Sequence, residues 1–407
     1  MADSTGFARL ATLCDTFGHR LSGSQNLEAA IDWVVREMKK DGFTAVRTEP
    51  VMVPHWVRGK ESLTMIVPWT ESLDILGLGG SIATPPDGIT ASVMVVSDFD
   101  ELERRQTEAR GKIVVFDAPF TTYGETVRYR YRGAIEAARY GAVASLIRSV
   151  TPFSMNTPHT GGMAYADTIP PIPHAAITIE AAEMLHRMTR RGQVPELNLK
   201  MEAKTLPDAE SRNIIVEIPG SEKPEEIIVM GGHIDSWDVG QGAMDDAGGC
   251  VASWEALRLI KNLGLKPKRT IRVVFWTNEE NGLRGGKTYY ENHKNENHVM
   301  AIESDGGVFA PRGFGFSGPD TLRNKLKEIA RGLKVIGADS IFAQGGGADI
   351  SPLMGAGVPG MGLKVEDSTY FWYHHTRADM ITVLNRDDFN RCVVALAYMV
   401  YSISEME

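Results

Sequence analysis

The sequence predicts a protein of the α/β class, with a mostly parallel mixed sheet that helices cover on both faces. Two observations predict this fold. From residue 211 onward, strand-like runs at 213–218, 227–232, 270–277 and 298–304 alternate with helical patterns at 248–262, 284–293 and 320–332. Such alternation is typical of a parallel sheet flanked by helices. In addition, the run 227–230 leads through a glycine-containing loop into a helical pattern, which is the order of one α/β unit.

The composition is ordinary for a globular protein with a sizeable core. The chain has 407 residues, of which 43% are apolar and 23% are charged, and this length favours two domains over one. With 43 basic and 52 acidic residues the net charge is −9, which disfavours a phosphate backbone as a partner. The longest apolar runs are too short for a membrane span. We therefore expect no nucleic-acid partner and no membrane span.

The N-terminal residues contain no basic region followed by an apolar core, so they do not form a signal peptide. No Asn-x-Ser/Thr acceptor is present, and three widely spaced cysteines, Cys14, Cys250 and Cys392, indicate no disulfide framework. The protein is therefore expected either to be intracellular or to start here at a mature N-terminus, and both facts favour a reducing compartment.

The first half of the chain contains two different patterns. Residues 7–18 and 26–42 have the spacing of amphipathic helices, and residues 43–67 favour a pair of strands. Beyond Pro68 the sequence becomes richer in glycine and β-type residues. Strands are then expected at 111–116, 141–147 and 175–179, and helices at 131–140 and 180–190.

This order predicts an inserted domain. The first 65 residues can be completed only by the part of the chain after residue 205, so we expect one discontinuous domain, 1–65 and 205–407, to carry the site. Residues 66–204 would then form the inserted domain.

The loop after the strand 227–232 carries residues suited to a divalent metal. His233 comes after two glycines, Asp235 lies two residues further on, and the pair Asp245-Asp246 lies twelve residues after the histidine. Imidazole nitrogen and carboxylate oxygen are both zinc ligands, and a further carboxylate can orient the histidine from behind. The loop therefore predicts part of a metal site.

Acidic and imidazole groups also come after other strand-like runs. Glu279 and Glu280 come after the run 270–277, and Asp305 comes after the run 298–304. Near the C-terminus, an aromatic stretch ends in His374 and His375. Two histidines and three carboxylates hold two zinc ions if one carboxylate bridges, and paired ions activate water and polarise a carbonyl. The candidate ligands are His233, Asp245, Glu280, Asp305 and His375.

Each signal also has an ordinary structural explanation. Asp245-Asp246 alone fits a helix N-cap pair, and Glu279-Glu280 before glycine fits a solvated turn. The coincidence of several such signals at successive strand ends favours the metal site. Gly345–Gly347 does not match the dinucleotide pattern of strand, glycines and helix, and is discounted.

These motifs resemble the co-catalytic di-zinc exopeptidases, a family that includes bacterial secreted aminopeptidases, glutamate carboxypeptidase II and the transferrin receptor. The resemblance runs from about residue 7 to the end, and the stretch from Gly231 to Asp246 is its longest and most specific part. It implies the zinc-peptidase fold. The segments 111–116 and 141–147 further resemble a protease-associated domain, so the insert is expected to be a lid of that kind.

The resemblance implies roles for individual residues. His233 and Asp305 would bind one zinc ion, Glu280 and His375 the other, and Asp245 would bridge the two ions of each chain. Glu279 would be the general base that activates the metal-bridged water, and Asp235 would support His233. His374 is a candidate oxyanion donor, at a position where many relatives have tyrosine. A cis peptide between Asp245 and Asp246 is also implied.

We therefore expect a zinc-dependent exopeptidase, a homodimer, that hydrolyses small peptides, chiefly dipeptides with a free N-terminus, and acts as a dipeptidase or aminopeptidase or as a carboxypeptidase. One alternative is a glutaminyl-peptide cyclase-like acyltransferase, which typically uses one zinc ion. Another is a non-catalytic, receptor-type binding protein on the same fold. Because all five ligands and the base are present, the sequence disfavours the receptor type.

Overall fold

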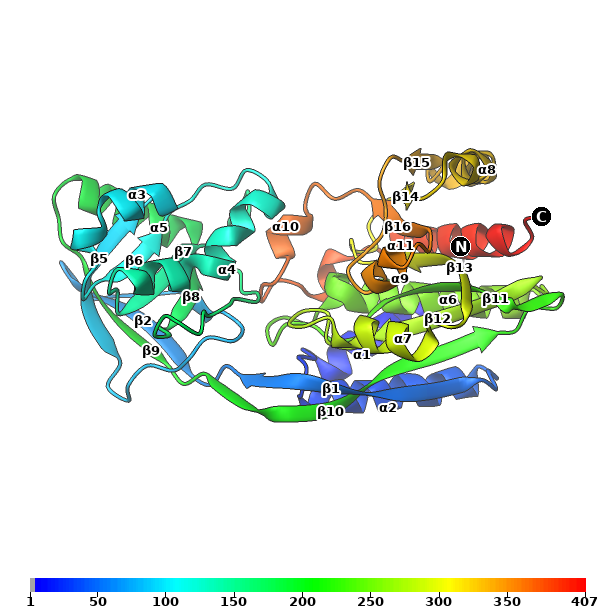
Figure 1. Cartoon of the computed structure of the whole chain (residues 1–407), viewed down its shortest axis with the longest axis horizontal. Coiled ribbons are helices and arrows are strands. Elements are labelled where there is room, and N and C mark those ends of the chain that lie inside the picture. The colour runs from blue at the N-terminus through cyan, green and yellow to red at the C-terminus, as the bar shows by residue number, and fades with distance from the viewer. Residues whose placement is uncertain (1–3) are drawn as a thin grey trace. The chain divides into compact units, whose positions relative to one another are not determined.

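The computed structural model describes residues 4–407 and divides into two compact units (Figure 1). The first comprises Met1–Pro54, Asp208–Tyr370 and Arg377–Glu407, and the second comprises His55–Pro207 and Phe371–Thr376. The second unit is thus wider than the predicted insert, 66–204. Its limits differ because two strands contain the boundaries between the units. Strand β1 (Val46–Val57) contains the boundary after residue 54, and strand β10 (Lys204–Ile218) contains the boundary after residue 207.

The sheet of the first unit confirms the predicted α/β class. Its strand order is β1-β10-β12-β11-β13-β16-β14-β15. The central strands β12, β11, β13 and β16 are parallel, whereas β10 pairs antiparallel with β12 and β14 antiparallel with β16. The remaining strand bounds are β11 (Lys223–His233), β12 (Arg269–Trp276), β13 (Asn297–Glu303), β14 (Pro311–Ser317), β15 (Ser340–Phe342) and β16 (Gly360–Val365).

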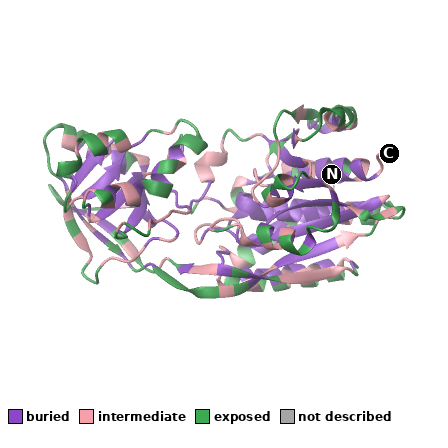
Figure 2. Cartoon of the chain, in the orientation of Figure 1, coloured by how far each residue is buried: buried purple, intermediate pink, exposed green. Residues whose placement is uncertain are grey.

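Helices cover both faces of this sheet, and its central strands β12, β11, β13 and β16 are largely buried (Figures 1 and 2). On one face, Val229, Val274 and Ala301 pack with residues of α7 and α9, while α6 and α11 contact the sheet elsewhere. No helix among residues 4–407 is both long enough and apolar enough to cross a bilayer. The helices are α1 (Thr5–Phe17), α2 (Gln25–Lys40), α6 (Gly248–Asn262), α7 (Arg284–His293), α8 (Asp320–Ala330), α9 (Ser351–Gly355) and α11 (Arg386–Ser404), with α10 (Tyr370–Tyr373) spanning a unit boundary.

The second unit has its own mixed sheet, ordered β3-β2-β9-β5-β6-β7-β8-β4. Strands β5 to β8 are parallel, and separate apolar clusters form from alternate residues of these strands. Its resemblance to a protease-associated domain stays a prediction. The elements are β2 (Glu61–Val67), β3 (Glu71–Leu73), β4 (Ile75–Gly77), β5 (Ile89–Val96), α3 (Phe99–Arg104), β6 (Ile113–Phe116), α4 (Tyr123–Arg139), β7 (Ala144–Arg148), β8 (His174–Ile177), α5 (Ile179–Arg190) and β9 (Glu196–Met201).

Some elements differ from the sequence predictions. Helix α4 begins at Tyr123 rather than at residue 131, because Thr122 caps it by accepting a hydrogen bond from the Glu125 amide at 3.3 Å. Strands β14 and β16 were not predicted, since each contains glycines that strands usually avoid. Their glycines serve close packing: a Cβ on Gly313 would lie 2.0 Å from the Ser340 carbonyl oxygen.

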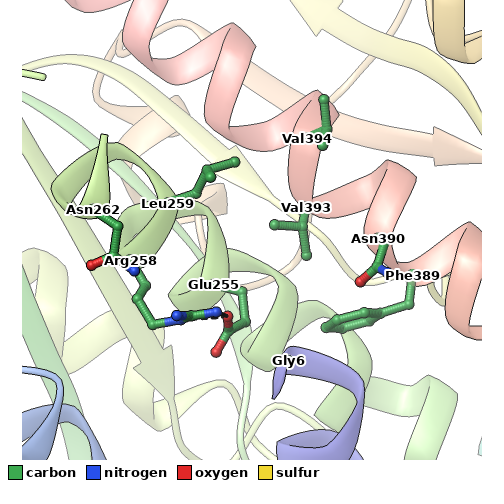
Figure 3. A pocket seen from close by; sticks show the side chains of 9 residues that line it. All are labelled: Gly6, Glu255, Arg258, Leu259, Asn262, Phe389, Asn390, Val393 and Val394. Atoms are coloured by element: carbon green, nitrogen blue, oxygen red, sulfur yellow. Dashed lines mark hydrogen bonds and ion pairs between the residues drawn. The ribbon is translucent and has the colours of Figure 1, made fainter. Parts of the chain in front are cut away.

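A pocket of about 130 Å³ lies where α1, α6 and α11 meet (Figure 3). Its polar wall is internally paired, because Glu255 contacts Arg258 at 2.6 Å and Arg9 at 2.5 Å. Phe389 forms part of the opposite wall and meets Phe7 edge to face, with ring centroids 5.9 Å apart. We interpret the pocket as a packing feature of these helices.

The packing at this pocket gives a stability prediction. Phe389→Ala should lower the free energy of unfolding by about 3–5 kcal/mol, because it removes a fully buried ring beside an existing cavity. The measurement is chemical denaturation of the metal-free protein. As a control, Val335→Ala alters a side chain that is 90% exposed and should change this free energy by no more than about 0.5 kcal/mol. Equal effects of the two substitutions would contradict the assignment of Phe389 to the core.

Candidate functional site

Three parallel strands of the first unit end beside one another and deliver the predicted residues to one edge of the sheet. His233 of β11 is in register with Trp276 of β12, and Gly231 is in register with Glu303 of β13. Glu279, Glu280 and Asp305 come just after the ends of these strands. The carboxyl ends of parallel strands are where α/β proteins gather reactive groups. Topology alone therefore explains why residues far apart in sequence meet here.

The side chains meet around the imidazole of His233. Its Nε2 lies 3.2 Å from an Asp245 carboxylate oxygen and 3.3 Å from an Asp305 carboxylate oxygen. Donor atoms of His233, Asp245 and Glu280 lie within 4.8 Å of one another, as do those of His233, Asp246 and Asp305. His233 is fully buried, whereas Asp305 and Glu280 are partly exposed. The arrangement leaves one side of the cluster accessible.

The other ring nitrogen of His233 fixes its orientation. Nδ1 donates to the main-chain carbonyl of Asp235 at 3.0 Å, so Nε2 is the nitrogen that faces Asp245 and Asp305 and that a metal ion would use. The Asp235 carboxylate is farther from Nδ1, at 3.7 Å, and instead accepts the amides of Glu279 and Glu280 at 3.1 and 3.3 Å. Asp235 therefore contacts His233 through its backbone and holds the Glu279-Glu280 turn through its side chain.

The loop that carries Asp245 is held by hydrogen bonds to its backbone. The Asp245–Asp246 peptide is cis, as the family resemblance implied, within the turn Ala243–Ala247. The buried carboxylate of Asp379 accepts three consecutive amides, those of Ala243, Met244 and Asp245, at 3.0, 2.8 and 3.3 Å. Asp246 accepts the amides of His233 and Gly249. Its neighbour in sequence, Asp245, is thereby aimed at His233.

Arg20 is a functional residue that the sequence did not identify beyond a loop. Its guanidinium is completely buried and donates to the carbonyls of Ile234, Gly18, Gln241 and Gly242 at 2.8, 2.9, 2.6 and 3.0 Å. Three of these carbonyls, those of Ile234, Gln241 and Gly242, lie between His233 and Asp245 in the sequence. A single arginine near a helix end has no sequence pattern that distinguishes it from a surface residue, so no signal could have found it.

The electrostatics of the site are dominated by buried acidic groups. Burial alone would lower the pKa of His233, but the charges of Asp305 and Glu279 and the hydrogen bonds with Asp245 and Asp305 raise it well above its usual value. Burial, together with the neighbouring charge of Asp305, raises the pKa of both Asp246 and Glu279 well above their usual values. An excess of carboxylates in a buried place is costly unless a cation neutralises it. The site therefore has the charge balance of a cation-binding site.

The donor set fits zinc. A tetrahedral zinc ion with bonds of about 2.0–2.2 Å separates its ligand atoms by roughly 3.3–3.6 Å. The separations of 3.2 and 3.3 Å between His233 and its two carboxylate neighbours lie close to the lower end of this range. Imidazole and carboxylate donors with an accessible side are also the combination found at catalytic zinc. The residues present can thus hold such an ion.

Two further buried acids lie near the cluster and were not predicted as site residues. Burial raises the pKa of Glu303 to about 8, and this carboxylate accepts the Ile350 amide at 3.0 Å. Among residues 4–407, neither carboxylate oxygen of Asp349 has a hydrogen-bond partner. Gly347, from the discounted glycine run, lies against Glu303, and a Cβ there would come within 2.1 Å of the carboxyl carbon. The glycine run therefore has a packing role.

His374 and His375 lie in the segment Phe371–Thr376, which belongs to the second compact unit. Rings of this segment stack on Tyr123 and Phe153 of the same unit. The predicted roles of the two histidines, a second metal ligand for His375 and an oxyanion donor for His374, stay predictions.

Comparison with known proteins identifies the class. The sequence profile described as "Peptidase family M28" matches residues 213–400, a range that includes all five candidate ligands and Glu279. The chain belongs to this peptidase family, and its class is that of a metallo-exopeptidase.

The resemblance to one group of relatives covers the whole chain. Carboxypeptidase Q of Xenopus laevis is 50% identical over 408 residues, covering 100% of this chain and 87% of the relative. The crystal structure of a peptidase M28 precursor from Shewanella amazonensis has a TM-score of 0.95 at 34% identity, covering 100% of this chain and 94% of that chain. A zinc aminopeptidase from Bacillus subtilis, at 22% identity over 99% of this chain and 96% of its own, shares the fold with a TM-score of 0.74.

The buried guanidinium of Arg20 gives a prediction for this site. Arg20→Met should lower the free energy of unfolding by at least about 3 kcal/mol, because several buried carbonyls lose a charged donor, each bond being worth roughly 1.5–3 kcal/mol. Urea denaturation of the metal-free protein measures this loss. The matched control is Arg36→Met, at an exposed position on α2, for which we expect a change within about 0.5 kcal/mol. An Arg20 variant as stable as the control would show that the loop does not depend on this residue.

Proposed function

We propose that the protein is a zinc-dependent exopeptidase that uses two zinc ions per chain to hydrolyse small peptides. The observation that carries this proposal is the approach of two carboxylates, Asp245 and Asp305, to the same nitrogen of His233 at 3.2 and 3.3 Å. Glu280 lies in the same donor cluster. Bound zinc would lower the pKa of water and polarise the carbonyl oxygen of the scissile bond.

Different residues of the chain would bind the metal ions and transfer the proton. His233 and Asp305 would bind one ion, Glu280 and His375 the other, and Asp245 would bridge them. Glu279 supplies the general base: it takes a proton from the attacking water and delivers it to the leaving amine nitrogen. Burial and nearby carboxylates raise the pKa of Glu279, and positive charge in the site would bring it back toward the range of a base.

Asp235 supports this division of roles by holding the backbone of both glutamates. Its two carboxylate oxygens accept the amides of Glu279 and Glu280 separately, at 3.1 and 3.3 Å. Glu280 shares a donor cluster with His233 and Asp245, whereas Glu279 belongs to none of the donor clusters among residues 4–407, so the two carboxylates have different neighbours. We propose that Glu280 faces a metal and Glu279 faces the reacting water.

The proposed substrates are dipeptides with a free N-terminus, as the family resemblance implies. A panel of dipeptides with free, acetylated and amidated termini tests this preference. Turnover that persists after acetylation of the N-terminus would contradict it.

The first prediction of this proposal concerns metal content. Protein purified without chelator and reloaded with zinc should contain two zinc ions per chain, because the ligand set divides into two groups that share Asp245. Elemental analysis combined with the protein concentration measures the ratio. One ion at saturation would contradict the two-ion site and favour the alternative cyclase-like acyltransferase.

The second prediction separates the two glutamates. Glu279→Gln keeps the shape but removes the base, so turnover should fall by about 10²–10⁴-fold while zinc content stays at the wild-type level. Glu280→Gln should instead lose zinc from one site. Zinc content and dipeptide turnover are measured on both variants.

The matched control is Glu291→Gln on α7, whose side chain is 63% exposed. It should leave both zinc content and turnover unchanged. If Glu279→Gln loses zinc and Glu280→Gln does not, the two roles are reversed. If neither variant changes turnover, the catalytic site lies elsewhere.

A further inference from the structure

The segment that carries the last candidate ligand packs within the second unit. Phe371–Thr376 clusters with His55–Pro207 rather than with the residues on either side of it in sequence. Trp372 stacks on Phe153 with ring centroids 4.5 Å apart, and Phe371 stacks on Tyr123 at 5.2 Å. The hydroxyl of Thr151 donates to the Phe371 carbonyl at 2.5 Å. These contacts join the aromatic part of the segment to the inserted unit.

The two histidines are held by hydrogen bonds from the same unit. His159 donates from Nδ1 to the carbonyl of His374 at 2.7 Å. The amide of Thr160 donates to the carbonyl of His375 at 3.0 Å, and the Nδ1 of His375 returns a hydrogen bond to the Thr160 carbonyl at 3.2 Å. His159 is suited to this task, because burial lowers its pKa to about 3 and keeps it neutral.

These hydrogen bonds stabilise an unfavourable backbone conformation at His375. His375 has a φ of +61°, in the left-handed region that residues other than glycine seldom adopt. Such a conformation persists only where the surroundings enforce it. Because the carbonyls of His374 and His375, which belong to the peptides before and after the His375 Cα, accept hydrogen bonds from His159 and Thr160, the inserted unit supplies that enforcement.

The Thr160 carbonyl also selects the tautomer of His375. A carbonyl oxygen only accepts hydrogen bonds, so Nδ1 must carry the proton and Nε2 must carry the lone pair. A histidine that binds metal through Nε2 requires this tautomer, and the partner of its Nδ1 usually tunes the metal affinity.

Arg130 of α4 fixes that carbonyl. Its Nη1 lies 3.4 Å from the Thr160 carbonyl oxygen and 3.5 Å from the Nδ1 of His375, and its Nη2 donates to the Tyr123 hydroxyl at 2.9 Å. The guanidinium is buried and fits only because residue 161 is glycine, where a Cβ would lie 2.3 Å from its central carbon. Arg130 thus packs against the Thr160–Gly161 backbone and the ring of His375.

We propose that Arg130, His159 and Thr160 are positioning residues that hold His375 ready to bind zinc, so that the inserted unit sets the affinity of one of the two zinc sites. This inference rests on the proposed function, in which His375 is a ligand. It gives these residues of the second unit a role in the orientation of a zinc ligand.

The test measures zinc affinity rather than turnover. Zinc competition with a chelating dye gives the two dissociation constants, and cobalt(II) substitution reports the visible spectrum of the occupied sites. Arg130→Met should weaken one site by about 10–100-fold and leave the other unchanged. Arg130→Lys should restore only part of the affinity, because it keeps the charge but loses the planar fork. Arg132→Met, on the same helix with a side chain 56% exposed, is the control and should match the wild type.

Tyr123→Phe provides a milder variant if Arg130→Met does not fold. It removes only the hydroxyl that holds Nη2 and should weaken the same site several-fold. Wild-type affinity at both sites in Arg130→Met, or in Tyr123→Phe where that is the variant that folds, would overturn the inference. Equal weakening of both sites would overturn it too, because a general loss of stability would explain that result.

His375→Ala separates the inference from the function on which it rests. Loss of one zinc ion in His375→Ala, with no effect of Arg130→Met, would reject only the positioning role. Retention of both ions in His375→Ala would reject the ligand set itself.

Discussion

Repulsion among buried carboxylates is the constraint on which the rest of the first unit depends. Asp245 and Asp305 approach one nitrogen of His233 at 3.2 and 3.3 Å. The charge of Glu279 helps to raise the pKa of His233, and the charges of Asp305 and Asp245 help to raise the pKa of Asp246. Like charges in a buried place push one another apart, so they stay together only where the chain is held. The supporting acids achieve this by accepting backbone amides, whose partial positive charges oppose the repulsion.

Arg20 stabilises the main-chain carbonyls of the site, whose partial charges are negative. The carboxylates of Asp379, Asp246 and Asp235 accept hydrogen bonds from main-chain amides of the surrounding loops. Arg20 donates hydrogen bonds to main-chain carbonyls of the same region. Both kinds of backbone group are therefore satisfied by charged side chains rather than by a helix or a sheet. The irregular loops of this site owe their order to these few charges, which explains how functional groups can sit on loops and still have fixed positions.

The sequence predicted what depends on local pattern. The alternation of strand and helix indicated the α/β class, and polar residues after successive strands singled out His233, Asp245, Glu280 and Asp305 as neighbours in one site. It did not predict β14 and β16, because their glycines are required by close backbone contacts in the folded sheet, which a local pattern does not reveal. Nor did it find Arg20, Asp349 or Arg130, whose burial results from tertiary packing and leaves no periodic trace in the chain. The roles of His374 and His375 remain predictions from sequence.

The second unit is built from two separate stretches of chain, and this has a consequence for how it can be isolated. Six residues near the C-terminus, Phe371–Thr376, belong to it as firmly as the long stretch His55–Pro207. Producing His55–Pro207 by itself would leave Tyr123 and Phe153 without the rings of Phe371 and Trp372 that stack on them. A separate copy of this unit therefore needs both stretches, with a linker in place of the chain between them.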